Sequence, residues 1–183
     1  IHPQIYVMAN SSITLTQLKK HLKDASKEEL IEDIAILFKS QPAVKDYFAL
    51  KLNPEGGSAI AESYKKKIEN EFFPARGIGR ARLSIARKAV NDFKKVCTMP
   101  IAVADIMVFY VEQGVRFTRE YGDIDESFYN SMESMYDEAL KLICRCKLQA
   151  EFEERCRGIV DDTSLMGWGF HDELKDMFEE AFE

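Results

Sequence analysis

Residues that interrupt helices are scarce in this chain. Its 183 residues include nine glycines and five prolines, so long irregular stretches are not expected. No segment alternates apolar and polar residues over the length of a strand, and the Asn-Gly and Asp-Gly turns of β-hairpins are absent. Because these are the signals of a β-sheet, their absence predicts an all-α protein.

Motifs for metal or covalent chemistry are also missing. The four cysteines form no C-x-x-C pair, and neither H-E-x-x-H nor G-x-S-x-G occurs. Structural zinc sites need two closely spaced pairs of ligands, so no metal and no cofactor is predicted, and no motif points to an enzyme. Unpaired thiols are typical of a reducing compartment. The cysteines are Cys97, Cys144, Cys146 and Cys156.

Long apolar runs are absent as well. The longest, residues 100–111, is interrupted by Asp105 and is shorter than the roughly 20 residues that span a bilayer. No secretory signal is visible near the start, so the expected location is the cytoplasm and no membrane partner is expected. Because Met8 is a candidate initiator, residues 1–7 are interpreted as upstream or vector sequence.

Helix signals run through the remainder of the chain. Thr14 with Gln17 forms a capping box, and Ser26 with Glu29 forms a second, which marks two helix starts. After an extension over residues 1–13, we expect one compact domain over 14–183, with eight or nine helices in stacked antiparallel hairpins that can approach a short solenoid. The later helices are expected at residues 42–52, 58–72, 80–96, 100–120, from 125 onward, 149–160 and 171–182.

Charge is strongly segregated along the chain, although the net charge is only −6. Residues 65–95 carry ten basic residues against three acids, whereas residues 120–138 carry seven acids and no lysine or arginine. Residues 151–183 carry eleven acids and three basic residues. Such a bipolar chain presents a basic segment and an acidic C-terminal region as candidate interaction surfaces.

Seven residues of the basic segment form a candidate anion-binding site. Three arginines surround a Gly-Ile-Gly sequence where a helix is expected to begin, and the N-terminus of a helix carries partial positive charge. Each arginine there costs about 0.3–1 kcal/mol when exposed and unpaired, which predicts a compensating anion. The candidate residues are Arg76, Gly77, Gly79, Arg80, Arg82, Arg87 and Lys88.

Three interpretations of these cations remain open. They can form the solvated face of an amphipathic helix, or they can pair internally with the acids around residues 120–126. They can also bind an external phosphate on a nucleotide, a nucleic acid or a phosphoprotein. The acidic net charge disfavours nucleic acid, since non-specific binding is mostly phosphate neutralisation. The glycine spacing matches neither a dinucleotide fingerprint nor a P-loop.

A second group of polar residues is a candidate pocket. Asp105 interrupts an otherwise apolar helix, and a buried carboxylate with a raised pKa would be a catalytic candidate. The simpler interpretation pairs Asp105 with an arginine and folds the tryptophan of the Gly-Trp-Gly sequence over the end of the core. An enzyme is a third hypothesis for this chain, with a pocket formed by Asp105, Arg116, Trp168 and His171.

Four segments carry a resemblance to a known family. They are LTQLKKHLKDASKEELIEDIAILFKSQPAVKDYFALKL (15–52), GIGRARLSIARKAVNDFKK (77–95), YVEQGVRFTREYGDIDESFYNSM (110–132) and IVDDTSLMGWGFHDEL (159–174). Together they are similar to an uncharacterised, all-helical bacterial family that is known only as a domain of unknown function. The resemblance implies a small helical protein of the bacterial cytoplasm, and it implies no active site.

Two binding hypotheses follow from these features. The first is a non-enzymatic helical interaction module that engages a protein partner, or a second copy of itself, through the basic helix at 76–95 or the acidic C-terminal region. The alternative is a protein that binds nucleic acid or phosphate with the arginine cluster at 76–88. A continuous basic surface would favour the alternative, because phosphate neutralisation supplies most of that affinity.

Overall fold

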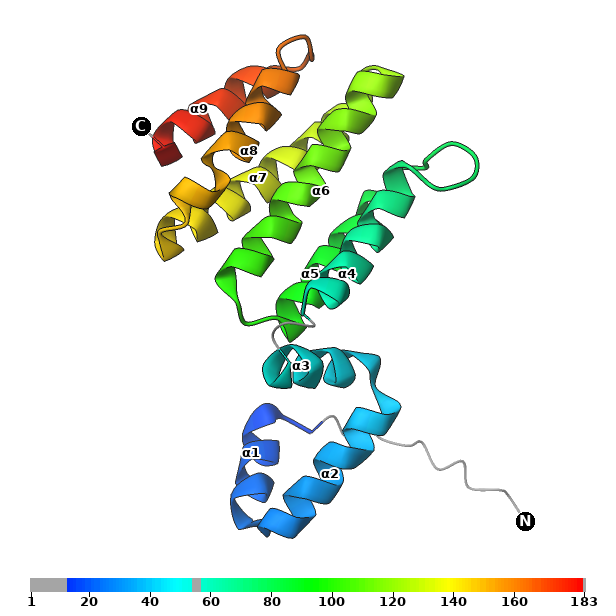
Figure 1. Ribbon diagram of the computed structural model, residues 1–183, viewed down its shortest axis with the longest axis vertical. Helices are drawn as coiled ribbons and strands as arrows, with labels where there is room; N and C mark the ends of the chain where they lie inside the picture. Colours follow the sequence, from blue (N-terminus) through cyan, green and yellow to red (C-terminus); the bar gives the residue numbers. More distant parts are fainter. Residues whose placement is uncertain (1–12, 54–56, 183) are drawn as a thin grey trace, which may run out of the picture. The chain divides into compact units, whose positions relative to one another are not determined.

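The computed structural model describes residues 13–53 and 57–182, and over these residues it contains nine α-helices and no strand (Figure 1). This confirms the all-α prediction. The expected helix ends agree with the structure to within three residues, and the largest difference is the helix expected from Arg80, which begins at Leu83. The helices are α1 (Leu15–Asp24), α2 (Lys27–Ser40), α3 (Pro42–Leu52), α4 (Gly57–Phe72), α5 (Leu83–Val96), α6 (Pro100–Tyr121), α7 (Glu126–Cys146), α8 (Gln149–Asp162) and α9 (Phe170–Phe182).

The helix starts are set by local side-chain bonds that the sequence already indicates. Both capping boxes form, because Thr14 and Ser26 each accept a hydrogen bond from the backbone three residues later, and the side chains of Gln17 and Glu29 reach back. Asp125 caps α7 by accepting from the backbone N–H of Phe128. Such caps satisfy backbone donors that the helix itself leaves unpaired.

The chain divides into two compact units, residues 1–45 and residues 46–183. In the first unit the structure describes α1, α2 and the beginning of α3, and residues 1–12 lie outside the described part. The second unit holds the remainder of α3 and all of α4–α9. A single domain over 14–183 therefore stays a prediction.

The second unit is a stack of three antiparallel helical hairpins, α4–α5, α6–α7 and α8–α9 (Figure 1). Helices α4, α6 and α8 follow one another in one layer, and α7 packs against α9 in the other. The longest helix, α6, contacts α4, α5, α7 and α8. This arrangement is the expected stack of hairpins, with the repeated layering of a short solenoid.

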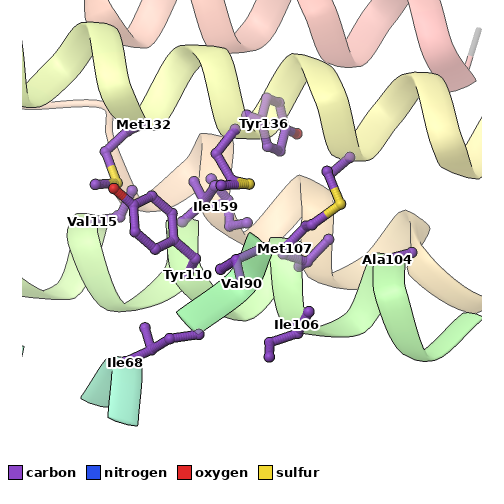
Figure 2. Packing of buried hydrophobic residues seen from close by; sticks show 14 of the residues in the cluster. Ile68, Val90, Ala104, Ile106, Met107, Tyr110, Val115, Met132, Tyr136 and Ile159 are labelled. Carbon is purple, nitrogen blue, oxygen red and sulfur yellow. The ribbon is translucent and has the colours of Figure 1, made fainter. Parts of the chain in front are cut away.

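The core of the second unit is organised around α6. Eleven residues of α6 are buried, among them Met107 and Tyr110. Figure 2 shows side chains from α4, α5, α7 and α8 gathered around this helix, including Met132 and Tyr136 of α7. Helices α6 and α7 approach closely at Gly114, where a Cβ would lie 2.2 Å from the sulfur of Met132. The near-continuous apolar sequence of α6 thus reflects burial on nearly all sides.

Candidate anion-binding loop between α4 and α5

The loop at residues 73–82 joins α4 to α5 and is tied to the end of α4. Phe72 is fully buried and anchors the last turn of α4 in the core. The backbone N–H of Ala81 donates to the carbonyl oxygen of Glu71 over 2.8 Å. This bond closes the loop back onto the helix that precedes it, so the intervening residues project from a fixed base.

The two glycines of the loop have different backbone roles. Gly77 has a φ of +78°, a conformation that glycine adopts without the steric cost of a Cβ. Gly79 approaches the backbone of α4 so closely that an added Cβ would lie 1.7 Å from the carbonyl oxygen of Phe72. The Gly-Ile-Gly sequence is therefore required by the path of the chain, whatever the loop binds.

Arg82 is neutralised by an acid of the preceding helix. Its Nε donates to Oε2 of Glu71 over 2.8 Å and its Nη2 donates to Oε1 over 2.9 Å. The Glu71 side chain is 10% exposed, so the guanidinium supplies the partner that a buried carboxylate requires. Hydrogen bonding to Glu71 raises the pKa of Arg82. One of the three arginines at the start of α5 thus has an internal counter-charge.

Arg87 is also paired internally, with residues of α7. It donates to the carbonyl oxygen of Ser131 over 3.1 Å, to the hydroxyl of Ser134 over 3.0 Å and to Glu138 over 2.6 Å. Lys94 donates to the other oxygen of Glu138 over 3.1 Å. Glu138 therefore forms ion pairs with two cations of α5 and links this helix to α7.

The remaining lysines of α5 share one acid on their own helix. Lys88 and Lys95 both form ion pairs with Asp92, four and three residues away. Hydrogen bonds from Lys88 and then from Lys95 are the main causes that lower the pKa of Asp92. Each cation of α5 thus has an acidic partner, although two carboxylates serve four cations. Internal pairing, with other acids than those around residues 120–126, accounts for Arg82, Arg87 and Lys88.

Arg76 and Arg80 differ from Arg82 and from the four cations of α5. Both are exposed, and neither makes an ion pair with any residue that the structure describes. Between them Ile78 is 74% exposed. The three side chains line a pocket of about 360 Å³, whose other lining residues are Asn70, Glu71, Pro74, Gly77 and Arg82. The pocket brings together four of the seven predicted anion-binding positions.

The internal counter-charges come from positions that the sequence did not single out. The internal-pairing interpretation named the acids around residues 120–126, but Asp125 caps α7 and Asp123 accepts a hydrogen bond from the hydroxyl of Tyr129. The acids that bind the arginines are Glu71 and Glu138. The sequence did point toward Glu138, because this residue ends the acidic stretch 120–138. No pattern pointed toward Glu71, which lies in a basic segment.

Asp105, the first member of the second candidate group, belongs to an ion-pair network between α4, α6 and α8. It accepts from Nη1 of Arg155 over 2.6 Å and lies 2.8 Å from the Nζ of Lys65. Arg155 also donates twice to Glu112, over 2.8 Å each, and this bonding raises the pKa of Arg155. Asp105 is therefore paired with an arginine, as the simpler interpretation expected.

The other members of that group lie in separate surroundings. Arg116 is eleven residues from Asp105 on α6, a rise of roughly 16 Å, and its guanidinium stacks 4.0 Å from the ring of Phe73. Trp168 is 65% exposed and does not fold over the core. No contact among the described residues joins the four side chains, so a common pocket stays a prediction.

His171 holds the turn between α8 and α9. Its Nδ1 lies 3.0 Å from the hydroxyl oxygen of Thr163, and that hydroxyl donates to the carbonyl oxygen of Val160 over 2.6 Å. Because the single hydroxyl proton is used on Val160, Nδ1 of His171 is the donor to Thr163. The ring therefore has a structural partner at this turn.

Two further observations concern the part of the chain that the structure describes. No helix in it combines the length and the apolar character that crossing a bilayer needs. No three His, Cys, Asp or Glu side chains in it are grouped as metal ligands. All four cysteines are free thiols, with Cys97 and Cys156 buried.

The family of the chain is shown by a match to a family model. The model of a family of unknown function, DUF6155, matches residues 13–183. No curated protein and no solved structure matches the chain. Membership of an uncharacterised family was expected from the sequence and is confirmed, whereas the bacterial origin and the cytoplasmic location expected with it stay predictions. Because the match covers nearly the whole sequence, the chain belongs to the DUF6155 family of unknown function.

Proposed function

We propose that this protein is a non-enzymatic helical interaction module whose binding element is the loop between α4 and α5. The stacked hairpins supply a rigid support, and the loop presents Arg76, Ile78 and Arg80 to an acidic segment of a protein partner. The acidic C-terminal region, residues 151–183, is a second charged surface of the same module. No cofactor or metal enters this proposal.

The observation that carries the proposal is the contrast between paired and unpaired cations. Arg82 and Arg87 are bonded to Glu71 and Glu138, whereas Arg76 and Arg80 have no ion-pair partner among the described residues. Unpaired guanidinium groups beside a pocket retain their capacity for bidentate bonds to carboxylate or phosphate. An acidic partner would supply the counter-charge that the chain itself provides elsewhere.

The exposed isoleucine favours a protein partner. Ile78 lies between the two arginines and is 74% exposed, although it belongs to a loop whose C-terminal end is bonded to Glu71. An apolar side chain surrounded by charge is typical of the anchor of a protein interface, and arginine is enriched at such interfaces. A peptide that combines acidic and apolar residues matches this surface better than a bare phosphate.

Phosphate or nucleic acid is the second candidate, and one observation favours it. Helix α5 begins after Arg82 without a side-chain cap, so its positive end lies beside Arg76 and Arg80, as in many phosphate sites. The alternative also relies on Arg87 and Lys88, which are already bound to Glu138 and Asp92. Because Arg87 and Lys88 are paired internally, fewer cations remain to contact the phosphates of a nucleic acid.

Fluorescence anisotropy with two probes tests the proposal. One probe is a short labelled peptide in which glutamates flank leucines, and the other is a single-stranded oligonucleotide of the same net charge. We expect the peptide to bind more tightly. The Arg76→Gln/Arg80→Gln variant should weaken peptide binding about tenfold or more, and Ile78→Ser should weaken the peptide but not the oligonucleotide.

The matched control is Lys88→Gln/Lys95→Gln, which removes the same charge from α5 outside the loop. If this control weakens peptide binding as much as the loop variant does, binding reflects general electrostatics and the proposal is wrong. If the oligonucleotide binds more tightly, with a steep dependence on salt, the second candidate replaces the first.

A further inference from the structure

The N-terminal unit exposes apolar stripes that its own helices do not cover. On α1, Leu15, Leu18 and Leu22 recur at helical spacing and are all exposed, and on α2 the same holds for Ile31 and Ile34. Neither helix has a single buried residue. Exposed apolar stripes of this kind mark interaction sites, since soluble monomers rarely expose large contiguous apolar patches.

The two helices also make few contacts with each other. Within the described part of this unit, α1 and α2 do not pack against each other along their lengths, unlike the helices of the three hairpins (Figure 1). Their lengths are 10 and 14 residues, and isolated helices of this size are marginal in water. Tertiary contacts with another surface are needed to hold them.

The charges of the two helices indicate what that surface is. Helix α1 carries three lysines and one aspartate, a net charge of +2, and α2 carries four acids and two lysines, a net charge of −2. None of these side chains makes an ion pair within the described residues, although Glu29 completes the capping box of α2. The basic α1 of one copy is therefore complementary in charge to the acidic α2 of a second copy, and both helices carry an apolar stripe.

We infer that two copies of this chain associate through their N-terminal units, with α1 of one copy against α2 of the other. In an isologous pairing each contact occurs twice, so both basic helices meet acidic ones while the apolar stripes are buried between them. The charges then set the orientation and the partner. This inference is independent of the loop between α4 and α5.

Two charge-reversal variants of the full chain test this pairing. Lys19→Glu/Lys20→Glu changes the net charge of α1 from +2 to −2, and Glu32→Lys/Asp33→Lys changes that of α2 from −2 to +2. The four positions are exposed and leave both capping boxes in place. Circular dichroism should show that each variant keeps its helical content.

Sedimentation velocity and light scattering then give the oligomeric state of each protein. The wild type should be a dimer, each variant alone should raise the dissociation constant about tenfold or more, and an equimolar mixture of the two variants should form a heterodimer. A monomeric wild type at all concentrations overturns the inference. So does dimerisation of either variant alone at the wild-type affinity, or a mixture that remains monomeric.

Discussion

Arg82 and Glu71 form a bidentate ion pair between the start of α5 and the end of α4. The guanidinium donates two hydrogen bonds, of 2.8 and 2.9 Å, to the two carboxylate oxygens. The same glutamate accepts the backbone N–H of Ala81 at its carbonyl oxygen. One residue thus holds the loop through both its side chain and its backbone, whereas Arg76 and Arg80 of the same loop form no ion pair with a described residue.

Replacing Glu71 by glutamine should loosen the base of the loop. The carboxylate is largely buried and its charge is satisfied by Arg82, so an amide leaves the guanidinium with a weaker partner. We expect a lower midpoint of thermal unfolding for Glu71→Gln and for Arg82→Gln. The double variant should be no less stable than the worse single variant, and additive losses would show that the two residues do not interact.

Gly79 should tolerate no side chain. Because an added Cβ would lie 1.7 Å from the backbone of Phe72, Gly79→Ala should lower the free energy of unfolding by about 1–3 kcal/mol, measured by urea denaturation. Gly158→Ala is the matched control, since nothing lies within 4 Å of a Cβ there. In helix α8 that change should be neutral or stabilising by up to about 1 kcal/mol. Equal losses for both variants would contradict the steric account.

The ion-pair network on α6 should depend on Arg155. Its removal leaves Asp105 with Lys65 alone and leaves Glu112 without its bidentate partner. Because Arg155 is about one-third exposed, we expect Arg155→Met to cost about 2 kcal/mol, less than the loss typical of a fully buried pair. Lys141→Met removes a surface pair with Asp137 and should change stability little. No difference between the two variants would mean that the network contributes nothing.

The ionised carboxylate of Glu133 should destabilise the fold at neutral pH. Burial, followed by the charge of Glu173, raises the pKa of this carboxyl. An acid with a raised folded-state pKa destabilises the fold above that value, and the penalty disappears as pH falls below the unfolded pKa of about 4.3. Glu133→Gln should therefore raise the midpoint of urea denaturation at neutral pH and have little effect near pH 3.5. An effect that is equal at both pH values would exclude the ionisation of Glu133 as its cause.

Much of the fold was predictable because its signals are local. The capping boxes at Thr14 and Ser26 form as expected, and Pro74 follows the end of α4. A cap needs only residues within one turn, so the sequence contains the whole interaction. The split of the chain into two units depends instead on which distant surfaces meet, and no local pattern reports that.

The sequence predicted which residue types form the candidate site. It did not predict which arginines are paired internally and which are not. The cluster of arginines at a helix start indicated a need for counter-charge, and Arg82 has one in Glu71. The choice of Glu71 depends on a loop that returns to α4, and Gly79 is needed there because of one carbonyl oxygen of Phe72. Arg116 likewise stacks on the ring of Phe73. These contacts depend on three-dimensional proximity that sequence spacing does not contain.

The most direct test of the central claim is an NMR titration of the isotopically labelled chain with the acidic, leucine-containing peptide. The account predicts saturable shifts that are largest at the backbone amides of residues 76–82, and that disappear in Arg76→Gln/Arg80→Gln. Shifts that are spread along α5 or centred on another surface, or no shifts at all, would contradict the claim that this loop recognises an anionic partner.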